Sequence, residues 1–320
     1  MRVRQPRIHV LGLGSIGTFT AHGLREIPGV APEINLRTLA GTTVSHGGYD
    51  VELHRNGQWQ TPSSAGTRDE DEIDHLIVTV KATQTNGCGM TDEVNEHLFP
   101  NPLTRPNYLV GVISHAVTLA SPFNATHRGA ASISLGLVPR TTTGQGAKEA
   151  GLEEGEAKAT TTYMLRALPL SARLSATSHV YTDLLQIQLE KLAVNAFCHP
   201  VCALHDAKNA VLFTMPALRR AILSEISTIV LNLPELAGVR GLEERFAVER
   251  LEETVNGILE RTRETTCSMV VDLRNHRETE VRYMNGYWVR RGRELGVSVA
   301  INESLMEQVL ERSVPKNQVP

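Results

Sequence analysis

Lys191 and Asn195 lie four residues apart in a stretch whose apolar pattern predicts a helix over residues 181–197, so both side chains fall on one helix face. Their neighbours in sequence are mostly apolar: Leu189, Leu192, Val194, Ala196 and Phe197. An ammonium group in apolar surroundings loses hydration, which lowers its pKa and readies it to release a proton. Such a group can stabilise and then protonate the negative oxygen that forms when hydride reduces a ketone. A lysine that merely reaches water from the edge of its helix explains these residues equally well.

A second polar pair, Ser268 and Glu280, flanks the apolar run at residues 270–273 and the polar turn at 274–278. On the residues alone, Thr279 and Glu280 are explained as the start of the next helix, where a carboxylate interacts favourably with the helix dipole. A chemical role for this pair therefore needs further support.

The cysteines raise the question of a metal site. There are four of them: Cys88, Cys198, Cys202 and Cys267. His199 and His205 stand close to two of these thiols, but the spacing fits no common zinc pattern, the surroundings are apolar, and Pro200 interrupts the group. Buried free thiols are the favoured interpretation, and no metal is expected.

The N-terminal segment carries a glycine pattern with a precise structural context. Gly12, Gly14 and Gly17 follow an apolar run at residues 7–11 and open a helical pattern at 18–26. In a Rossmann-type unit these glycines permit the tight turn, the approach of a pyrophosphate and the close packing of helix on strand. The amides at the helix start, including those of Ser15 and Ile16, would then face the anion. A glycine-rich turn without a ligand is the alternative.

The end of the second strand selects between the two nicotinamide dinucleotides. A strand is expected over residues 33–37, with Glu33 at its start and Arg37 at its end. An acid at the strand end favours NAD, whereas an arginine favours the 2′-phosphate of NADP. Arg37 therefore favours NADP, although a solvated loop residue is an equally good interpretation of it.

Composition bounds the remaining possibilities. The 320 residues give room for two domains, 41% of them are apolar, and the net charge of −3 argues against binding nucleic acid through a basic face. No run reaches the roughly 18 apolar residues of a membrane span, and the short basic N-terminus predicts a cytoplasmic protein without a leader. The layout predicts an α/β Rossmann-type domain over residues 1–177 and an all-α domain over 178–320.

Periodicity gives the expected elements. Further strands are predicted at residues 49–53 and 58–59 as a hairpin, at 75–80 and 108–114 as parallel strands buried on both faces, and at 131–137. The composition of residues 141–161, rich in Thr, Gly, Glu and Ala, predicts a mobile insertion or a linker. The helix over 181–197 should end at His199-Pro200, and the other helices are expected at 215–232, 242–264, 265–273, 279–295 and 304–310.

The segment Thr-Arg-Pro-Asn-Tyr at 104–108 resembles the fungal branch of the ketopantoate reductase family, and four blocks together resemble the family as a whole. They are Leu-Gly-Leu-Gly-Ser-Ile-Gly at 11–17, Val-Thr-Val-Lys-Ala-Thr-Gln-Thr at 78–85, Lys-Leu-Ala-Val-Asn-Ala at 191–196 and the stretch 268–302. The resemblance covers most of the chain. It implies a Rossmann domain followed by a helical domain of the 6-phosphogluconate dehydrogenase C-terminal type, with the active site in the cleft between them.

The resemblance also implies a reaction and its residues. Members of the family reduce 2-dehydropantoate, a small 2-oxo acid, to pantoate with NADPH for pantothenate biosynthesis. Lys191 would be the general acid, while Asn195, Ser268 and Glu280 would position the substrate. In the block at 78–85 and just after it, the residues that would line the cofactor are Lys81, Gln84 and Asn86. The assembly would be a monomer or homodimer without nucleic-acid or membrane partners.

Two departures from the family pattern stand out. At the position four beyond Asn195 the family usually has a substrate-binding asparagine, and here it is His199, whose imidazole still donates a hydrogen bond. The second departure is that Asn86 follows Thr85 at once, so the helix and strand expected between them cannot exist, because a parallel crossover needs a dozen or more residues. The stretch 36–49 also looks shortened. True divergence and a skipped coding segment explain the gaps equally well.

These departures keep two alternatives open. His199 motivates a reductase of another 2-oxo acid, and the shortened nucleotide domain motivates a non-catalytic descendant that still binds NADP. A shortened sheet would lack a central strand, which would leave apolar surface exposed or change the strand pairing.

Overall fold

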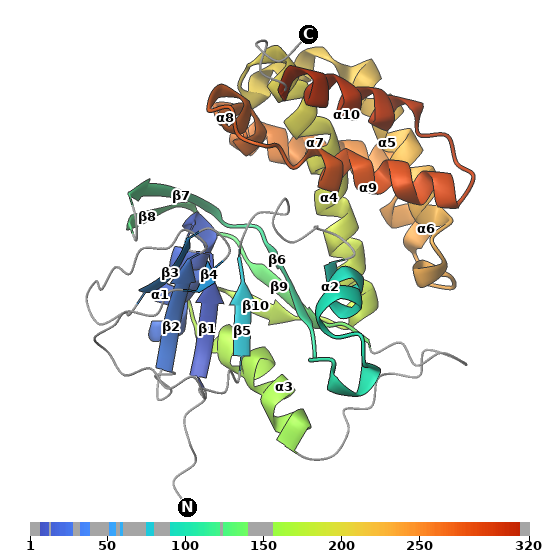
Figure 1. Cartoon of the computed structure of the whole chain (residues 1–320). Helices are drawn as coiled ribbons and strands as arrows, with labels where there is room; N and C mark the ends of the chain where they lie inside the picture. The colour runs from blue at the N-terminus through green and yellow to red at the C-terminus, as the bar shows by residue number, and fades with distance from the viewer. Residues whose placement is uncertain are drawn as a thin grey trace, which may run out of the picture. The chain divides into compact units, whose positions relative to one another are not determined.

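The computed structural model describes residues 7–12, 14–27, 33–38, 51–55, 58–59, 75–79, 90–121, 124–139 and 156–313. Figure 1 shows the course of the chain, which divides into two units. The first comprises Met1–Val80 and Arg105–Leu184, and the second comprises Lys81–Thr104 and Leu185–Pro320. One of the three boundaries, between Leu184 and Leu185, falls inside the helix Tyr181–His205 rather than in a linker. In the described part of the chain, no helix combines the length and apolar character that crossing a membrane requires.

A five-stranded sheet forms the centre of the first unit (Figure 1). Its strands, in chain order, are β1 (Arg7–Leu11), β2 (Glu33–Thr38), β3 (Val51–Arg55), β4 (Gln58–Trp59) and β5 (His75–Val78). In the sheet their order is β4-β3-β2-β1-β5, and every pair is parallel except the β3–β4 hairpin. Helix α1 (Ser15–Arg25) follows β1 directly and buries Phe19, Ala21 and Leu24. The predicted strand–glycine–helix opening is confirmed.

Strand β5 departs from the expected burial on both faces. It pairs with β1 and stands at the end of the strand order. Leu76 and Val78 point to one side and are 50% and 41% exposed, whereas Ile8 and Val10 of β1 are completely buried. A crossover helix after β5 would normally cover such a face. The exposed face is therefore what the shortened sequence after this strand leads one to expect.

A second, three-stranded sheet contains β6 (Leu109–Ile113), β9 (Ile133–Leu137) and β10 (Ala176–Ser178). The prediction that residues 108–114 form a parallel strand was wrong, because β6 pairs with β9 in antiparallel register from Leu109↔Leu137 to Ile113↔Ile133. Its apolar run reflects contact with the core rather than a place in a parallel sheet. The strand predicted at 131–137 is confirmed as β9.

A hairpin and two helices complete the first unit and its connections. Strands β7 (Ala116–Ser121) and β8 (Asn124–Gly129) form the hairpin, which packs on α1 through the rings of His115, His127 and Phe19. Helix α3 (Glu156–Ala167) corrects the expectation of a linker through residue 161, since the helix begins at 156 and buries Met164 and Ala167. Residues 141–155 lie outside the described part. Helix α2 (Met90–Leu98) belongs to the second unit.

The second unit is helical, in agreement with the predicted fold class. Besides α2, its helices are α4 (Tyr181–His205), whose first turn lies in the first unit, α5 (Pro216–Leu231), α6 (Leu242–Arg245), α7 (Val248–Thr262), α8 (Ser268–Arg274), α9 (Val281–Glu294) and α10 (Ala300–Ser313). Short 3-10 turns lie at Pro102–Thr104, Leu168–Leu170, Asn209–Thr214 and Pro234–Leu236. The single helix expected over 242–264 is two helices, because buried Phe246 sits in the break between α6 and α7.

The core of this unit draws on α4 and on every helix from α5 to α10. Helix α7 presents Leu251, Val255 and Leu259 at four-residue spacing, which is the pattern of a helix with one buried face. Helix α4 is apolar on most of its circumference, as befits a central helix. Among the largest completely buried side chains are Phe197 of α4 and Trp288 of α9.

The prediction that α4 ends at His199-Pro200 was wrong, because the helix continues to His205 with Pro200 in its interior. Proline lacks the amide that would bond the carbonyl four residues earlier, and this normally kinks or ends a helix. Here the Asn285 side chain of α9 donates to the Ala196 carbonyl oxygen at 2.9 Å. A tertiary contact therefore supplies the hydrogen bond to the Ala196 carbonyl that Pro200 cannot form.

Candidate active site and cofactor loop

The glycine loop, residues 12–17, has the geometry that a dinucleotide pyrophosphate requires. Gly12 has a φ of +95°, in the region that favours glycine. A Cβ on Gly17 would lie 1.8 Å from the Gly12 carbonyl oxygen, so only glycine lets α1 approach β1 this closely. A Cβ on Gly14 would meet nothing within 4 Å, and the first turn of α1 carries no acidic residue. An open helix N-terminus without negative charge fits a phosphate group.

Thr79 holds the loop from the end of β5. Its amide donates to the Leu11 carbonyl oxygen at 2.8 Å. Its hydroxyl oxygen lies 2.7 Å from the Gly12 carbonyl oxygen and 3.1 Å from that of Leu11, so its one proton is shared between two acceptors. A Cβ on Gly17 would also lie 2.6 Å from the Thr79 hydroxyl. Sequence reasoning missed Thr79 as a loop-positioning residue, although it lies inside the block at 78–85.

The other proposed cofactor residues are placed only in part. Arg37 lies in β2, paired in register with Leu11 of β1 and Glu52 of β3, one residue before the strand ends. This backbone position is near the carboxyl end of the strand, where the 2′ position of the ribose would be recognised. The remaining predicted residues, Lys81, Gln84 and Asn86, lie outside the described part of the chain.

Helix α4 brings Lys191, Asn195 and His199 onto one face at four-residue spacing, and we call these three residues the α4 stripe. Lys191 is exposed, and Asn195 and His199 are partly buried. The residues packed around the base of Lys191 desolvate its ammonium group and lower its pKa. The predicted apolar neighbours of Lys191 all belong to the buried core. The environment is that of a lysine able to give up a proton.

His199 is neutral at physiological pH. Burial and the nearby charge of Lys191 together lower its pKa to about 4, and Asp272 acts in the opposite direction. Its Nδ1 is buried and has no hydrogen-bond partner within the described ranges. A neutral imidazole offers one donor and one acceptor, so it can orient a polar ligand without adding charge.

Two other helices begin beside this part of α4. The Cys267 thiol, at the N-cap of α8, lies 3.8 Å from the His199 carbonyl oxygen, which places Ser268 in the first turn of α8 next to α4. Ser268 is exposed. Glu280 is the N-cap residue of α9, yet its side chain makes no capping hydrogen bond, so capping does not explain this carboxylate. All five predicted catalytic and substrate residues thus lie in the second unit.

The thiols near His199 are buried and free, as expected. Burial raises the pKa of Cys198 to about 12. A hydrogen bond between Cys202 and Cys267 raises the pKa of the first thiol and lowers that of the second. Over the residues that the structure describes, no three potential ligands converge on a point where a metal ion could bind. Cys88 lies outside those residues.

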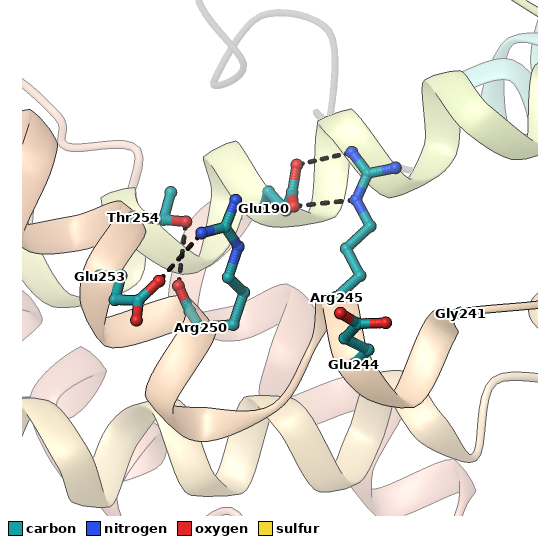
Figure 2. Close-up of a pocket in the computed structure, with 7 residues that line it drawn as sticks. All are labelled: Glu190, Gly241, Glu244, Arg245, Arg250, Glu253 and Thr254. Carbon is teal, nitrogen blue, oxygen red and sulfur yellow. Dashed lines mark hydrogen bonds and ion pairs between the residues drawn. The ribbon is translucent and has the colours of Figure 1, made fainter.

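Two cavities in the second unit lie apart from the predicted site residues. The larger, about 780 Å³, is lined by charged residues of α4, α6 and α7, and Figure 2 shows that Arg245 forms a two-point ion pair with Glu190, with distances of 2.7 and 2.9 Å. The second, about 420 Å³, lies along α9 and α10 near Arg282, Arg290 and Met306. The Glu190–Arg245 pair fixes one side of α4, next in sequence to Lys191.

Sequence reasoning missed two buried polar residues close to the α4 stripe. Asp272 of α8 is 3% exposed, lies 3.7 Å from the Arg277 guanidinium, and influences His199 electrostatically. Asn285 of α9 is completely buried and bonds α4 directly. Asp272 could have been noticed in the sequence, because it is a charged residue inside the apolar run at 270–273. Nothing in the local sequence indicates the partner of Asn285.

Comparisons with known proteins agree with this arrangement. The family model described as "Ketopantoate reductase PanE/ApbA" matches residues 8–86, and its companion "Ketopantoate reductase PanE/ApbA C terminal" matches residues 183–313. A curated relative from Schizosaccharomyces pombe, "Probable 2-dehydropantoate 2-reductase", is 25% identical over 342 residues, covering 93% of this chain and 94% of the relative.

Solved structures share the fold at lower identity. A dimeric ketopantoate reductase from Staphylococcus aureus has a TM-score of 0.62 at 16% identity, and D-mandelate dehydrogenase with NADH and anilino(oxo)acetate has a TM-score of 0.62 at 18% identity. Each alignment covers 96% of this chain and 98% of the other. Matching family models at both ends, the glycine loop and the α4 stripe lead to one conclusion: the chain belongs to the ketopantoate reductase family, a family of oxidoreductases.

Proposed function

We propose that this protein reduces 2-dehydropantoate to pantoate with NADPH, a step toward pantothenate. The observation that carries the proposal is the α4 stripe, on which an ammonium group of lowered pKa shares one helix face with an amide and a neutral imidazole. The names of the curated relatives support the substrate. The proposed setting is the cytoplasm.

Lys191 is the proposed general acid. When hydride reaches the keto carbon, the carbonyl oxygen takes up negative charge and then the Lys191 proton, and Lys191 regains a proton from water. Asn195 and His199 would donate hydrogen bonds to substrate oxygens, because both sit within two helical turns of Lys191. Ser268 and Glu280 would orient the carboxylate and hydroxyl groups of the substrate from the starts of α8 and α9.

The glycine loop is the proposed cofactor site. Gly12, Gly14 and Gly17 would accommodate the pyrophosphate, with the amides of Ser15 and Ile16 at the start of α1 facing it. The nicotinamide, when bound, supplies the hydride. Arg37 supports NADP over NAD, and Lys81, Gln84 and Asn86 complete the proposed set by their match to the family pattern.

The test follows NADPH oxidation by absorbance with 2-dehydropantoate present. Turnover by the wild type is expected, together with its loss in Lys191→Ala. Lys208→Ala is a matched control, since Lys208 is an exposed lysine that pairs with Glu264 away from the α4 stripe, and full activity is expected. NADPH binding without turnover in the wild type would favour a non-catalytic descendant, and an unchanged rate in Lys191→Ala would reject the mechanism.

A second candidate is reduction of a different 2-oxo acid. His199 stands where the family usually has asparagine, and an imidazole differs from an amide in shape. The fold is shared with a D-mandelate dehydrogenase, whose ligand in the solved structure is an aryl-substituted oxo acid. Comparing kcat/KM over branched and aromatic 2-oxo acids decides between the two, and a strong preference for 2-dehydropantoate rejects this candidate.

The proposed assembly is a homodimer. The solved ketopantoate reductase from Staphylococcus aureus with the same fold is described as dimeric, which supports this choice. Sedimentation at several protein concentrations measures the mass directly, and a constant monomer mass would reject a dimer.

A further inference from the structure

A chain of hydrogen-bonded polar side chains, which begins at the partly buried Glu225 and continues through the completely buried Asn302 and Asn285, runs through the second unit and ends on α4. Glu225 of α5 accepts from the amides of Ile301 and Asn302 at the start of α10, at 2.8 and 3.1 Å, and from the Asn302 side chain at 2.8 Å. The Asn285 Nδ2 of α9 donates to Asn302 Oδ1 at 3.1 Å and to the Ala196 carbonyl oxygen at 2.9 Å. Four helices are thus joined by one polar network.

The end of this network lies where the backbone of α4 lacks a donor. Pro200 has no amide hydrogen, so the Ala196 carbonyl has no intrahelical partner in the usual pattern. An unpaired carbonyl in a completely buried place is strongly unfavourable. Asn285 is 0% exposed and supplies the hydrogen bond that residue 200 does not supply.

The orientation of Asn285 supports this assignment. Its Nδ2 serves two acceptors, whereas its own Oδ1 is buried without a partner in the part of the chain that the structure describes. Turning the amide over would place its oxygen against the Ala196 and Asn302 oxygens, so those two acceptors fix the amide as it stands. The role of the Asn285 side chain is therefore to donate these two hydrogen bonds.

The turn that Asn285 stabilises carries two members of the α4 stripe. Asn195 precedes Ala196, and His199 precedes Pro200, so the helical path between 195 and 200 decides whether both side chains share a face with Lys191. We infer that Asn285 is a positioning residue of the active site, which acts by replacing the backbone donor lost at Pro200. This inference rests on the proposed function.

The test is a double-mutant cycle with Asn285→Ala, Pro200→Ala and the double variant. In Asn285→Ala, KM for 2-dehydropantoate should rise about tenfold or more, because Asn195 and His199 lose their fixed path, while NADPH affinity stays within about twofold. In the double variant the amide of residue 200 can bond Ala196 again. Its KM should therefore return to within about threefold of that of Pro200→Ala.

A control variant separates positioning from general destabilisation. Val309→Ala truncates a completely buried apolar side chain of α10, about two helical turns after Asn302. It should lower stability and leave KM unchanged. An equal rise in KM for Val309→Ala, or a double variant as impaired as Asn285→Ala, overturns the inference.

Urea unfolding of the same variants gives a readout that needs no turnover. The hydrogen-bond replacement is supported if the unfolding free energies of Asn285→Ala and Pro200→Ala are not additive. This support holds even if the wild type reduces no 2-oxo acid, because that outcome would overturn only the proposed function. Turnover by the wild type combined with additive free energies and unrescued KM overturns this inference and leaves the proposed function standing.

Discussion

The glycine loop of the first unit and the α4 stripe of the second are held by different kinds of interaction. The loop is fixed by a close backbone approach within one segment, where a Cβ on Gly17 would lie 1.8 Å from the Gly12 carbonyl oxygen, and by one distant side chain, Thr79, whose hydroxyl contacts the carbonyl oxygens of residues 11 and 12. The stripe is fixed by side chains that come from other helices, among them Asn285 of α9 and Arg245 of α6, which pairs with Glu190 of α4. The close approach of the glycines can be predicted from a local motif, whereas side-chain contacts between distant segments, including those of Thr79 and those between helices, cannot.

The two units also differ in how completely they bury their apolar surface. The helical core includes residues from all the helices from α4 to α10, and many of its members are completely buried. In the first unit, β5 ends the strand order and exposes Leu76 and Val78. The exposed apolar face of β5 therefore belongs to the unit that holds the proposed cofactor loop.

The largest expected effect is the loss of catalysis without loss of cofactor binding. Lys191→Ala should lower kcat for 2-dehydropantoate by about 10²- to 10⁴-fold, the usual contribution of a general acid. NADPH affinity, measured by calorimetry, should stay within about twofold because the glycine loop lies in the other unit. A parallel loss of NADPH binding would mean that the two sites are not separable in this way.

A smaller effect concerns the pH dependence of stability. Because the pKa of His199 is about 4 in the folded protein against an ordinary value of 6.5, the unfolded chain binds a proton between these values that the folded protein does not bind. The contribution of neutral His199 to the free energy of unfolding is therefore fully present above pH 6.5. It falls by about 3 kcal/mol as the pH drops toward 4. In His199→Asn this slope should be absent from urea unfolding measured at pH 7, 5.5 and 4.5. An unchanged slope would assign the pH dependence to other groups.

Two glycine variants should separate stability from binding in the loop. Gly17→Ala forces a Cβ against the Gly12 carbonyl and should destabilise the first unit by about 1–3 kcal/mol. Gly14→Ala has open space and should leave the melting temperature unchanged, yet weaken NADPH binding about tenfold or more by obstructing the pyrophosphate. Equal NADPH affinity in Gly14→Ala and wild type would place the cofactor elsewhere.

The smallest effect is expected on the exposed face of β5. Leu76→Thr should change the unfolding free energy by less than about 0.5 kcal/mol, because the side chain is already half in water. Ile8→Ala in the neighbouring β1 is the matched buried substitution and should cost about 2–5 kcal/mol. A large loss in Leu76→Thr would show that something covers this face in solution.

Much of the fold was predictable because its signals are local. The glycine loop, strands β1 and β2, the β3–β4 hairpin and the start of the helical unit all follow from periodicity and turn residues. The errors have different causes. Strand β6 was assigned a parallel place from its apolar run, and that run does not reveal that β9 is its partner. The helix over residues 156–161 was obscured by its threonines and glutamate.

For the site, the sequence by itself determined the glycine loop and the face shared by Lys191, Asn195 and His199, since both depend on spacing within one segment. Only the tertiary structure decided that α4 continues past Pro200. The reason is physical: a proline removes a hydrogen bond locally, and the replacement donor, Asn285, comes from 89 residues away in sequence. It also decided that His199 is neutral, because burial and the charges of Lys191 and Asp272 depend on packing that no single segment encodes.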